Sequence, residues 1–403
     1  MTFSKIPLAT RILVGLLFGA GAGLVAGPKA AALGVVGKVY IDLIKMMAIP
    51  LVFLSITDAV ISTTISWRGA GRWLLIIAVN TSLALMLGLA ISNTFRPGDG
   101  FLGSARGELS QAPVEVALPS LASVLDTVVP NSIIQPFADN NVLSVVLCAL
   151  LVGAAVRRYR KEKERECATE PAFAELRGAL SVLSIMLLWL VQLVPLAVLC
   201  VTAKTVGEHG FAPFRNLTEY VLLGCLGMAV QSVLVYSAWI WGVARVPLGR
   251  FLRAAKKPVV YAFGTNSSLA TLPLTLDALD ELGVSKGASR LGACIGTNFN
   301  NDGILLYEAM AVLFVAQAYG IELSLGQQAA AAAVSLVAAI GVAGVPEAGV
   351  VSLSLVLSAV GLPLEFVPLL LTVDWIVARM RSVTNVLSDM TVSAAIDGLS
   401  SSR

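Results

Sequence analysis

The 403-residue sequence predicts an all-α polytopic membrane protein with eight transmembrane helices and two opposed re-entrant helical hairpins. First, 57% of the residues are hydrophobic and only 13% are charged, about half the charged share of soluble globular chains. Second, apolar runs of about 20 residues, which only lipid or a helix bundle can bury, recur along the chain. Third, the last third contains two similar segments in which polar patches bearing Gly or Pro interrupt apolar runs.

The composition also excludes several classes of protein. The net charge of +3 says little about partners, and no basic stripe with interleaved aromatic residues indicates nucleic-acid binding. The only histidine, His209, is expected in an outer loop, and no HExxH, GxSxG or Walker A pattern is present, so we expect neither an enzyme nor a bound cofactor. The cysteines are scattered and predict neither disulfides nor a metal site; they are Cys148, Cys167, Cys200, Cys225 and Cys294.

Six apolar segments precede residue 257, and the first of them is expected to be a retained span and not a cleaved signal. They cover residues 9–26, 39–62, 73–95, 121–156 (broken), 180–205 and 217–244. Every second connection is rich in Lys and Arg, as in "RRYRKEKERE" and "ARVPLGRFLRAAKK". Because basic loops stay inside, we expect a multi-pass protein of the inner (plasma) membrane with cytoplasmic N- and C-termini.

Two hairpin-plus-span units follow. In each, an apolar arm reaches a polar tip, "GTNSSLATLP" or "GVAGVPEAG", and a second arm leads to a long span with a polar centre. Such a tip cannot face lipid, because its backbone polar groups would be unsatisfied. Since the two tips enter from opposite faces, the units form an inverted repeat, which is typical of secondary transporters. Ordinary spans with a few small residues at helix contacts are the alternative interpretation.

The segment "DWIVARMRSVTNVLSDM" concentrates charge in an otherwise apolar region. On a helix, a single stripe contains Asp374, Ala378, Arg381, Asn385 and Asp389, whereas Arg379 lies on its flank. The planar guanidinium of Arg381 suits a carboxylate, and the Asp389 carboxylate suits a small hard cation. The alternative is that the span ends near Ala378 and an amphipathic cytoplasmic tail follows.

A second polar centre, "GTNFNNDG", interrupts another apolar span. Asn, Asp and Gly are poor in helix interiors, so we expect an unwound stretch. The freed carbonyls of Gly296, Asn298 and Asn300, together with the Asp302 carboxylate, would bind a cation. With the charged stripe, this pattern predicts a cation-coupled transporter for a small anion.

At these motifs the sequence resembles the glutamate transporter family, the dicarboxylate/amino acid:cation symporters. The similarity covers nearly the whole chain and includes "KMMAIPLVFLSI", "SSLATLP", "NNDG", "AGVPEAG" and "DWIVARMRSVTNVLSD", in the family's order. It implies a homotrimer that works as an elevator, with the second hairpin as outer gate. Residues 1–70 (spans 1 and 2) and 99–210 (spans 4 and 5) would form the scaffold. Residues 71–98 (span 3) and 211–403 (span 6, both hairpins, spans 7 and 8) would form the transport domain.

The resemblance also implies sodium as the coupling ion. One sodium site would comprise Gly296, Asn300, Asn385 and Asp389, and another Thr81, Ser82, Asn300 and Asp302; Asn298 would add its carbonyl. Three positions depart from the family's pattern, namely Ala78 in place of Tyr, Asn301 in place of Met and Val342 in place of Thr. The last two weaken the inference of a further site beside the second hairpin, which relies on backbone carbonyls.

The implied substrate site departs further from the family. Its residues would be Asn266, Ser267, Ser268, Ile304, Val345, Gly349, Ala378, Arg381, Ser382 and Asn385. Ser268 and Asn385 match the groups for one carboxylate, and Arg381 matches the clamp for the other. Ala378 replaces the family's aspartate for the substrate amino group, and Ile304 replaces a threonine. An unpaired buried ammonium would lose a bond worth ~1.5–3 kcal/mol. We therefore expect an amino-less C4-dicarboxylate.

The alternative substrate is an acidic amino acid, glutamate or aspartate, with Asp374 substituting for the missing acid one turn away. An anion channel is a third, less favoured function. Glu308 and Arg379 match a pair implicated in proton and potassium coupling in eukaryotic members, and here they would form a proton relay or a structural ion pair. Glu347 at the second hairpin tip has no explanation in the sequence.

Overall fold

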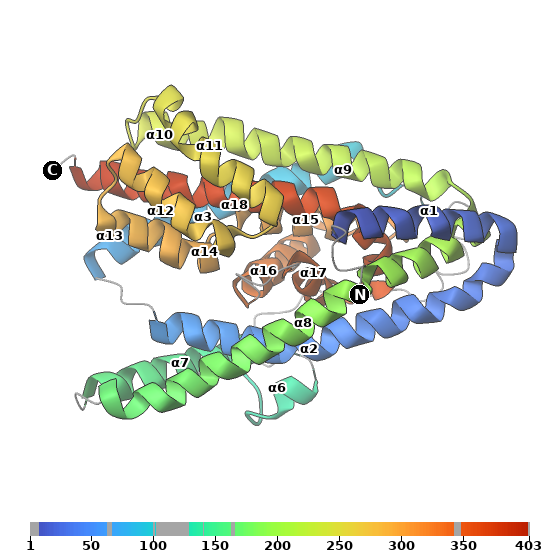
Figure 1. The fold of residues 1–403 in the computed structure, drawn as a ribbon, viewed down its shortest axis with the longest axis horizontal. Helices are drawn as coiled ribbons and strands as arrows, with labels where there is room; N and C mark the ends of the chain where they lie inside the picture. The colour runs from blue at the N-terminus through green and yellow to red at the C-terminus, as the bar shows by residue number, and fades with distance from the viewer. Residues whose placement is uncertain are drawn as a thin grey trace.

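The computed structural model describes residues 8–62, 67–99, 101, 129–139, 141–162, 166–341 and 348–401 (Figure 1). Within these ranges every regular element is a helix, so the predicted all-α class is confirmed for the described residues. The beginning of the broken fourth span and most of the second predicted tip, with Val342, Val345 and Glu347, lie outside the described residues.

The helices follow the predicted apolar segments closely. The first part of the chain contains α1 (Leu8–Ala26), the 3-10 turn η2 (Gly27–Leu33), α2 (Gly34–Ser62), α3 (Trp67–Phe95), α6 (Gln135–Ala138), α7 (Val142–Glu162) and α8 (Glu166–His209). The next part contains α9 (Ala212–Val230), the π turn η4 (Gln231–Val235), α10 (Tyr236–Gly242), α11 (Leu248–Thr265) and α12 (Ser268–Leu282). The last part contains α13 (Lys286–Ser289), the π turn η5 (Arg290–Ile295), α14 (Gly296–Phe299), α15 (Asp302–Ala318), α16 (Leu325–Gly341), α17 (Ala348–Ala359), η6 (Leu364–Phe366) and α18 (Val367–Ser401).

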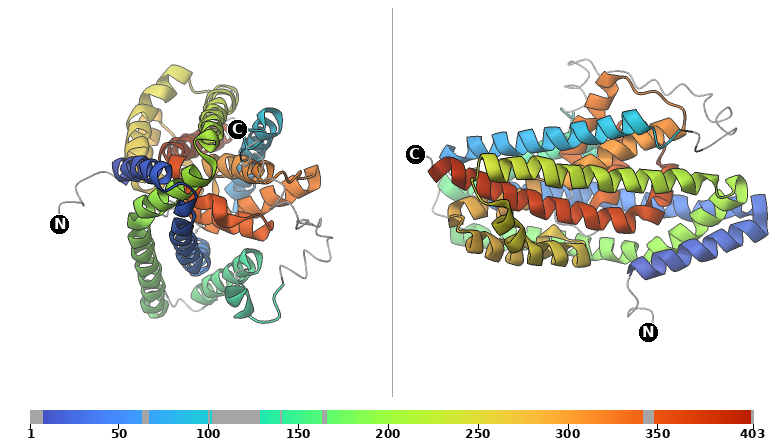
Figure 2. Two further views of the ribbon diagram at one scale, coloured as in Figure 1. Left: turned by 90° about the vertical axis from the view of Figure 1, so that its right-hand side faces the viewer. Right: turned by 90° about the horizontal axis from the view of Figure 1, so that it is seen from above.

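Four helical stretches of the described residues are long and apolar enough to cross a membrane. They are Thr10–Tyr40, Gly71–Phe95, Ala174–Glu208 and Phe214–Gly242. The first of these stretches includes the η2 turn, which separates α1 from α2. Figure 2 shows the long helices running side by side along the long axis of the molecule.

Helices α1 and α8 pack with almost no space between their backbones. A Cβ atom at Gly15, Gly19 or Gly23 would lie only 2.4–2.6 Å from a backbone carbonyl oxygen of α8. Small residues allow this close approach, which is a common way for helices to associate in membranes. Helix α8 also contacts α2, which in turn contacts α7, so these four helices pack mainly against one another.

Helix α15 lies at the centre of the remaining helices. All of its residues are buried, and it contacts α3, α9, α16, α17 and α18. Helices α11 and α12 pack against each other and against α18, while α16 and α17 form a second contacting pair. The first pair is joined at Asn266, whose left-handed backbone (φ 53°) ends α11, and at Ser267, which caps α12.

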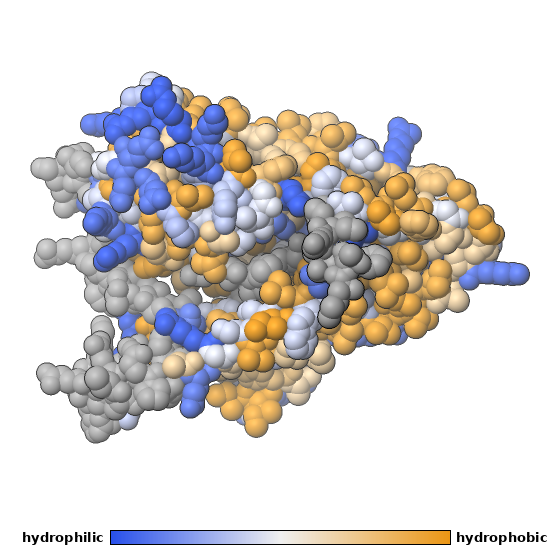
Figure 3. Space-filling view, in the orientation of Figure 1, coloured by the Kyte–Doolittle hydropathy of each residue, from blue (hydrophilic) through white to orange (hydrophobic). Residues whose placement is uncertain are grey.

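Basic connections gather at one end of the molecule. The ends of α2, α7 and α10 and the C-terminal end of α18 lie together, at the left of Figure 1. In Figure 3 hydrophilic residues cover this end over α10–α12, whereas hydrophobic residues cover most of the right-hand part of the visible face. Exposed residues of the patch are Arg245, Arg250, Arg253, Lys256 and Lys257.

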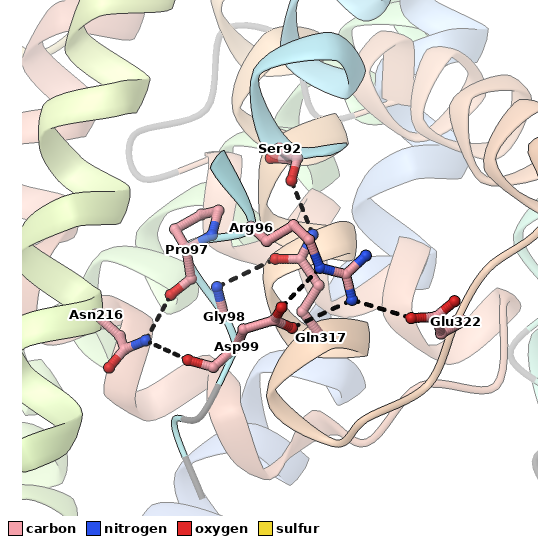
Figure 4. Close-up of polar contacts among 8 residues, drawn as sticks. All are labelled: Ser92, Arg96, Pro97, Gly98, Asp99, Asn216, Gln317 and Glu322. Carbon is pink, nitrogen blue, oxygen red and sulfur yellow. Dashed lines mark hydrogen bonds and ion pairs between the residues drawn. The ribbon is translucent and has the colours of Figure 1, made fainter. Parts of the chain in front are cut away.

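A cluster of polar residues holds the C-terminal end of α3 in place (Figure 4). Arg96 has a left-handed backbone (φ 47°) and pairs with Asp99 at 2.6 Å and with Glu322, before α16, at 3.1 Å. Asn216 of α9 donates hydrogen bonds to two backbone carbonyls of the same turn, at 2.8 and 2.9 Å. Gln317 of α15 bonds to backbone groups on both sides of Arg96. The end of α3 is therefore tied to α9 and α15.

Candidate functional site

The predicted interruption of the apolar span before α15 is confirmed at Asn300 and Asn301, but the expected freeing of the Gly296 and Asn298 carbonyls is wrong for Gly296. The Gly296 carbonyl accepts a hydrogen bond from the backbone N–H of Asn300 at 2.7 Å, and Gly296 and Asn298 both lie in the short helix α14. Helix α14 ends at Phe299, and the backbone then leaves the helical region at Asn300 (ψ 72°) and Asn301 (ψ 51°). Both side chains are buried, and α15 begins at Asp302. Two successive asparagines are compatible with this geometry because their amides bond to neighbouring groups in place of the helical ladder.

Two buried carboxylates flank this break. Asp302 accepts hydrogen bonds from Thr81 of α3 (3.3 Å), Tyr236 of α10 (3.0 Å) and Ser388 of α18 (2.6 Å). Its side chain is fully buried. Three helices besides its own thus position this carboxylate.

Asp389 of α18 is the second buried carboxylate. It accepts hydrogen bonds from Thr297 of α14 at 2.8 Å and from the Asn300 amide at 3.1 Å. Gly296 lies directly against it, since a Cβ atom there would be 3.0 Å from Asp389 Oδ1. The structure therefore brings Gly296, Asn300 and Asp389 together, as predicted for one cation site.

The groups around the two carboxylates fit a small hard cation. They offer carboxylate, hydroxyl and amide oxygens, which are the ligands that such cations prefer. Two amide oxygens near them are buried without a hydrogen-bond partner among the described atoms: Asn300 Oδ1 and Gln231 Oε1. Gln231 interacts with Asp302 and lies in the π turn η4. A buried carbonyl oxygen without a partner is costly, and a bound cation would satisfy it.

Not every predicted cation ligand joins this group. Ser82 is exposed on α3, away from the buried face that carries Thr81. Asn298 lies in α14, two residues before the break begins at Asn300. No group of three or more His, Cys, Asp or Glu side chains that could hold a metal occurs among the described residues, so the candidate sites depend on neutral oxygens as much as on charge.

Asn385 links the break to α18. Its Oδ1 accepts a hydrogen bond from the backbone N–H of Gly303 at 2.8 Å, and its Nδ2 donates to Asn301 Oδ1 at 3.3 Å. A Cβ atom at Gly303 would lie 2.6 Å from the carbonyl oxygen of Arg381. The first turn of α15 is therefore held directly against the polar stripe of α18.

Arg381 is the centre of the predicted substrate site. Its guanidinium pairs with both oxygens of Asp374, at 2.8 and 3.0 Å, and both residues are buried (4% and 2% exposed). It also stacks over the ring of Tyr307, 4.2 Å from the centroid. Gly349, in the first turn of α17, abuts the guanidinium, since a Cβ atom there would lie 2.5 Å from Cζ. Charged groups this deeply buried require such partners.

The α11–α12 tip approaches the same helix. Asn266 accepts a hydrogen bond from the Ser382 hydroxyl at 3.0 Å, and Ser267 caps α12 by accepting from the backbone N–H of Ala270. Ser268 is half-buried beside them. Ala378 and Ile304, at the two positions that depart from the family's pattern, are buried. The described residues of the predicted substrate site thus come from the tip, α15, α17 and α18.

A cavity of about 170 Å³ adjoins the Asp374–Arg381 pair. On one side it is lined by the α11–α12 tip and α18, including Asn266, Asp374, Trp375 and Arg379. The opposite wall comes from α1, α2 and α8, including Tyr40. The cavity gives a small solute room next to the buried ion pair.

Glu308 and Arg379 do not form an ion pair in the structure. Arg379 donates to the backbone carbonyl of Trp375 and lies over its ring, facing the cavity. Glu308 is fully buried in α15 beside the hydroxyls of Ser335 and Ser352, on α16 and α17. Among the described residues, Arg381 is a basic group that acts on it electrostatically.

The site contains residues that the sequence reasoning missed. Ser388, Tyr236 and Thr297 all bond to the two buried carboxylates. A usable signal was the polar pair Gln231 and Tyr236 in an apolar span, because polar groups at that depth indicate function.

Residues 8–399 match the model of the sodium:dicarboxylate symporter family. The C4-dicarboxylate transport protein of Solibacter usitatus is 29% identical over 98% of this chain and 93% of its own length. The proton/sodium-glutamate symport protein of Bacillus subtilis is 28% identical, covering 94% and 90%. The rabbit (Oryctolagus cuniculus) neutral amino acid transporter B(0) is 29% identical, covering 95% and 77%.

These relatives carry different substrates at nearly equal identity, so identity alone does not select a substrate. The match spans almost the entire chain and includes both polar centres that form the buried site. Members of such a family are transporters and not enzymes. The chain belongs to the sodium:dicarboxylate symporter family.

Proposed function

We propose that the protein is a sodium-coupled symporter of small carboxylates that prefers an amino-less C4-dicarboxylate. The observation that carries this proposal is the buried guanidinium of Arg381, whose neighbouring acid, Asp374, is bonded to it through both oxygens. A planar guanidinium binds carboxylates bidentately, so a substrate carboxylate can take over this interaction.

The neighbourhood of Ala378 supports a substrate without an amino group. Ala378 is buried and offers only a methyl group where the family resemblance implies an aspartate. Asp374, one turn earlier, is paired with Arg381, and a substrate carboxylate that replaced it there would release it, which is the basis of the second candidate below. A buried ammonium without a partner would lose ~1.5–3 kcal/mol, about one to two orders of magnitude in affinity.

Sodium is the coupling ion that the oxygen-rich surroundings of Asp302 and Asp389 support best. Thr81, Thr297 and Asn300 would hold the two carboxylates in place, and the unpartnered amide oxygens would complete the coordination. When bound, sodium ions supply the driving force of the symport and neutralise the buried acids.

The proposed architecture has eight spans and two re-entrant hairpins, α11–α12 and α16–α17. The helices α1, α2, α7 and α8 would be the scaffold, and α3 with α9–α18 the transport domain of an elevator. In a homotrimer in the inner membrane, the end rich in exposed Arg and Lys would face the cytoplasm. The cavity between α8 and α18 lies along the surface where the two domains would slide.

Uptake by purified protein in liposomes tests the proposal. An inward sodium gradient should drive labelled succinate and not labelled aspartate, and replacing external sodium by choline should stop uptake. Aspartate uptake without succinate uptake would establish the second candidate, an acidic amino-acid symporter in which Asp374 holds the ammonium. Flux only down a substrate gradient would indicate a channel.

A further inference from the structure

Ser388 lies between the two buried carboxylates of the candidate cation sites. Its hydroxyl donates to Asp302 Oδ2 at 2.6 Å and accepts from Asn300 Nδ2 at 2.8 Å. The same amide nitrogen donates to Asp389 Oδ1 at 3.1 Å. One unbroken path of hydrogen bonds therefore joins Asp302 to Asp389, and Ser388 is fully buried within it.

The path fixes which way the Asn300 amide points. A serine hydroxyl has one proton, and here that proton is committed to Asp302. Asn300 thus faces two acceptors, the Ser388 oxygen and the Asp389 carboxylate, and must present its NH₂ group to both. Its Oδ1 is left buried and without a partner among the described atoms. An oxygen in that state is a ready ligand for a cation.

We propose that Ser388 is a positioning residue that couples the two cation sites. This inference rests on the proposed sodium coupling. A cation that binds the Asp302 carboxylate competes with the hydrogen bond that Ser388 donates to it. The Ser388 hydroxyl then changes its orientation, and with it the hydrogen bond that orients Asn300. That change alters the oxygen offered to the cation at Asp389, and by linkage the effect is reciprocal.

The other hydroxyls at the site lack this double role. Thr81 and Tyr236 bond to Asp302, whereas Thr297 bonds to Asp389. Thr384 lies one turn before Ser388 on α18 and donates only back to the carbonyl of Met380. It is a matched control, because it is a buried hydroxyl on the same helix without a bond to either carboxylate.

Sodium titration of the purified protein without substrate tests the inference. Tryptophan fluorescence and Tm are followed as sodium chloride replaces choline chloride at constant ionic strength. The wild type and Thr384→Ala should show a Hill coefficient above 1. Ser388→Ala should show a Hill coefficient of about 1 and an apparent sodium affinity weakened at least ~5-fold. Ser388→Thr, which restores the hydroxyl, should regain the wild-type behaviour.

Several results would overturn the coupling role. They are a wild-type Hill coefficient of 1, an unchanged coefficient in Ser388→Ala, or the same loss in Thr384→Ala. If Ser388→Ala does not fold, Ser388→Val and Ser388→Thr, which are nearly equal in size, give the same comparison. If the wild type showed no response to sodium, the proposed coupling ion would be rejected instead. The wild type alone detects that failure, so it is distinguishable from a failure of the Ser388 role.

Discussion

Asp374 and Arg381 lie seven residues apart on α18 and form a buried ion pair through both carboxylate oxygens, at 2.8 and 3.0 Å. About two helical turns separate them, so both side chains project from one face of the helix. The Asp374 carboxylate thus binds the Arg381 guanidinium, which is the group proposed to bind a substrate carboxylate. If a substrate carboxylate binds Arg381 as proposed, it would replace Asp374, so that Arg381 would stay paired while Asp374 would lose its partner.

Replacing Arg381 should weaken the binding of dianions. Arg381→Lys keeps the charge and loses the planar fork, so we expect succinate affinity to fall at least ~10-fold. Arg381→Ala should also lower Tm, because it leaves Asp374 buried without its partner, at a cost of about 3–5 kcal/mol. Calorimetric titration with succinate and a thermal melt measure the two effects. Wild-type affinity in Arg381→Lys would refute the clamp role.

Introducing an acid at residue 378 should change the substrate class. Ala378→Asp places a carboxylate one turn from Asp374, so aspartate should bind and succinate should bind more weakly through charge repulsion. Ala378→Asn is the matched control, because it has the same size without the charge. Binding of both ligands to the three proteins decides the question. No gain of aspartate binding in Ala378→Asp would show that another group excludes the ammonium.

The polar centres were predictable from local sequence, and their tertiary partners were not. The break at Asn300 and Asn301 follows from residue types that disfavour helix in an apolar span, and the stripe with Arg381 follows from helical periodicity. Ser388 was not predicted as a partner of Asp302, because their contact joins helices 86 residues apart in the chain. Local patterns identify helices and breaks but not which buried hydroxyl faces which acid.

The expected Glu308–Arg379 pair depends on side-chain competition that sequence does not show, whereas the exposure of Ser82 follows from helical periodicity that the prediction of a Thr81–Ser82 site did not apply. Arg379 turns to Trp375, one turn earlier on its own helix, where its cation stacks on the ring and faces the cavity. Glu308, on α15, faces the hydroxyls of Ser335 and Ser352 instead. Ser82 follows Thr81 directly, yet a step of 100° turns it to the exposed side of α3.

Glu308 provides a test of proton coupling. A fully buried carboxylate without an ion pair is expensive, so a proton or a bound cation would neutralise it. Glu308→Gln should make succinate uptake insensitive to external pH. Glu322→Gln, which removes an exposed carboxylate paired with Arg96, should leave the pH profile as in the wild type. The same pH profile in Glu308→Gln and the wild type would assign Glu308 a structural role.

Asp389 should set the sodium requirement. Asp389→Asn removes a charge but keeps the size of a side chain that accepts bonds from Thr297 and Asn300, so apparent sodium affinity should fall at least ~10-fold. Asp397→Asn makes the same change two turns later, where the carboxylate accepts a bond from the backbone of Ser285. It should leave sodium activation unchanged. Equal sodium activation in both variants would count against a cation site at Asp389.

The contact between α1 and α8 predicts opposite effects for two glycines in one helix. A Cβ atom at Gly19 would lie 2.4 Å from the carbonyl oxygen of Leu199, whereas one at Gly21 would meet nothing within 4 Å. Gly19→Ala should therefore force the two backbones apart, at about 1–3 kcal/mol, and lower Tm. Gly21→Ala should leave Tm unchanged or raise it, since alanine favours a helix over glycine by roughly 0.5–1 kcal/mol. Thermal melts of both variants in detergent measure the difference. If Gly19→Ala were as stable as Gly21→Ala, α1 and α8 would not pack at this distance.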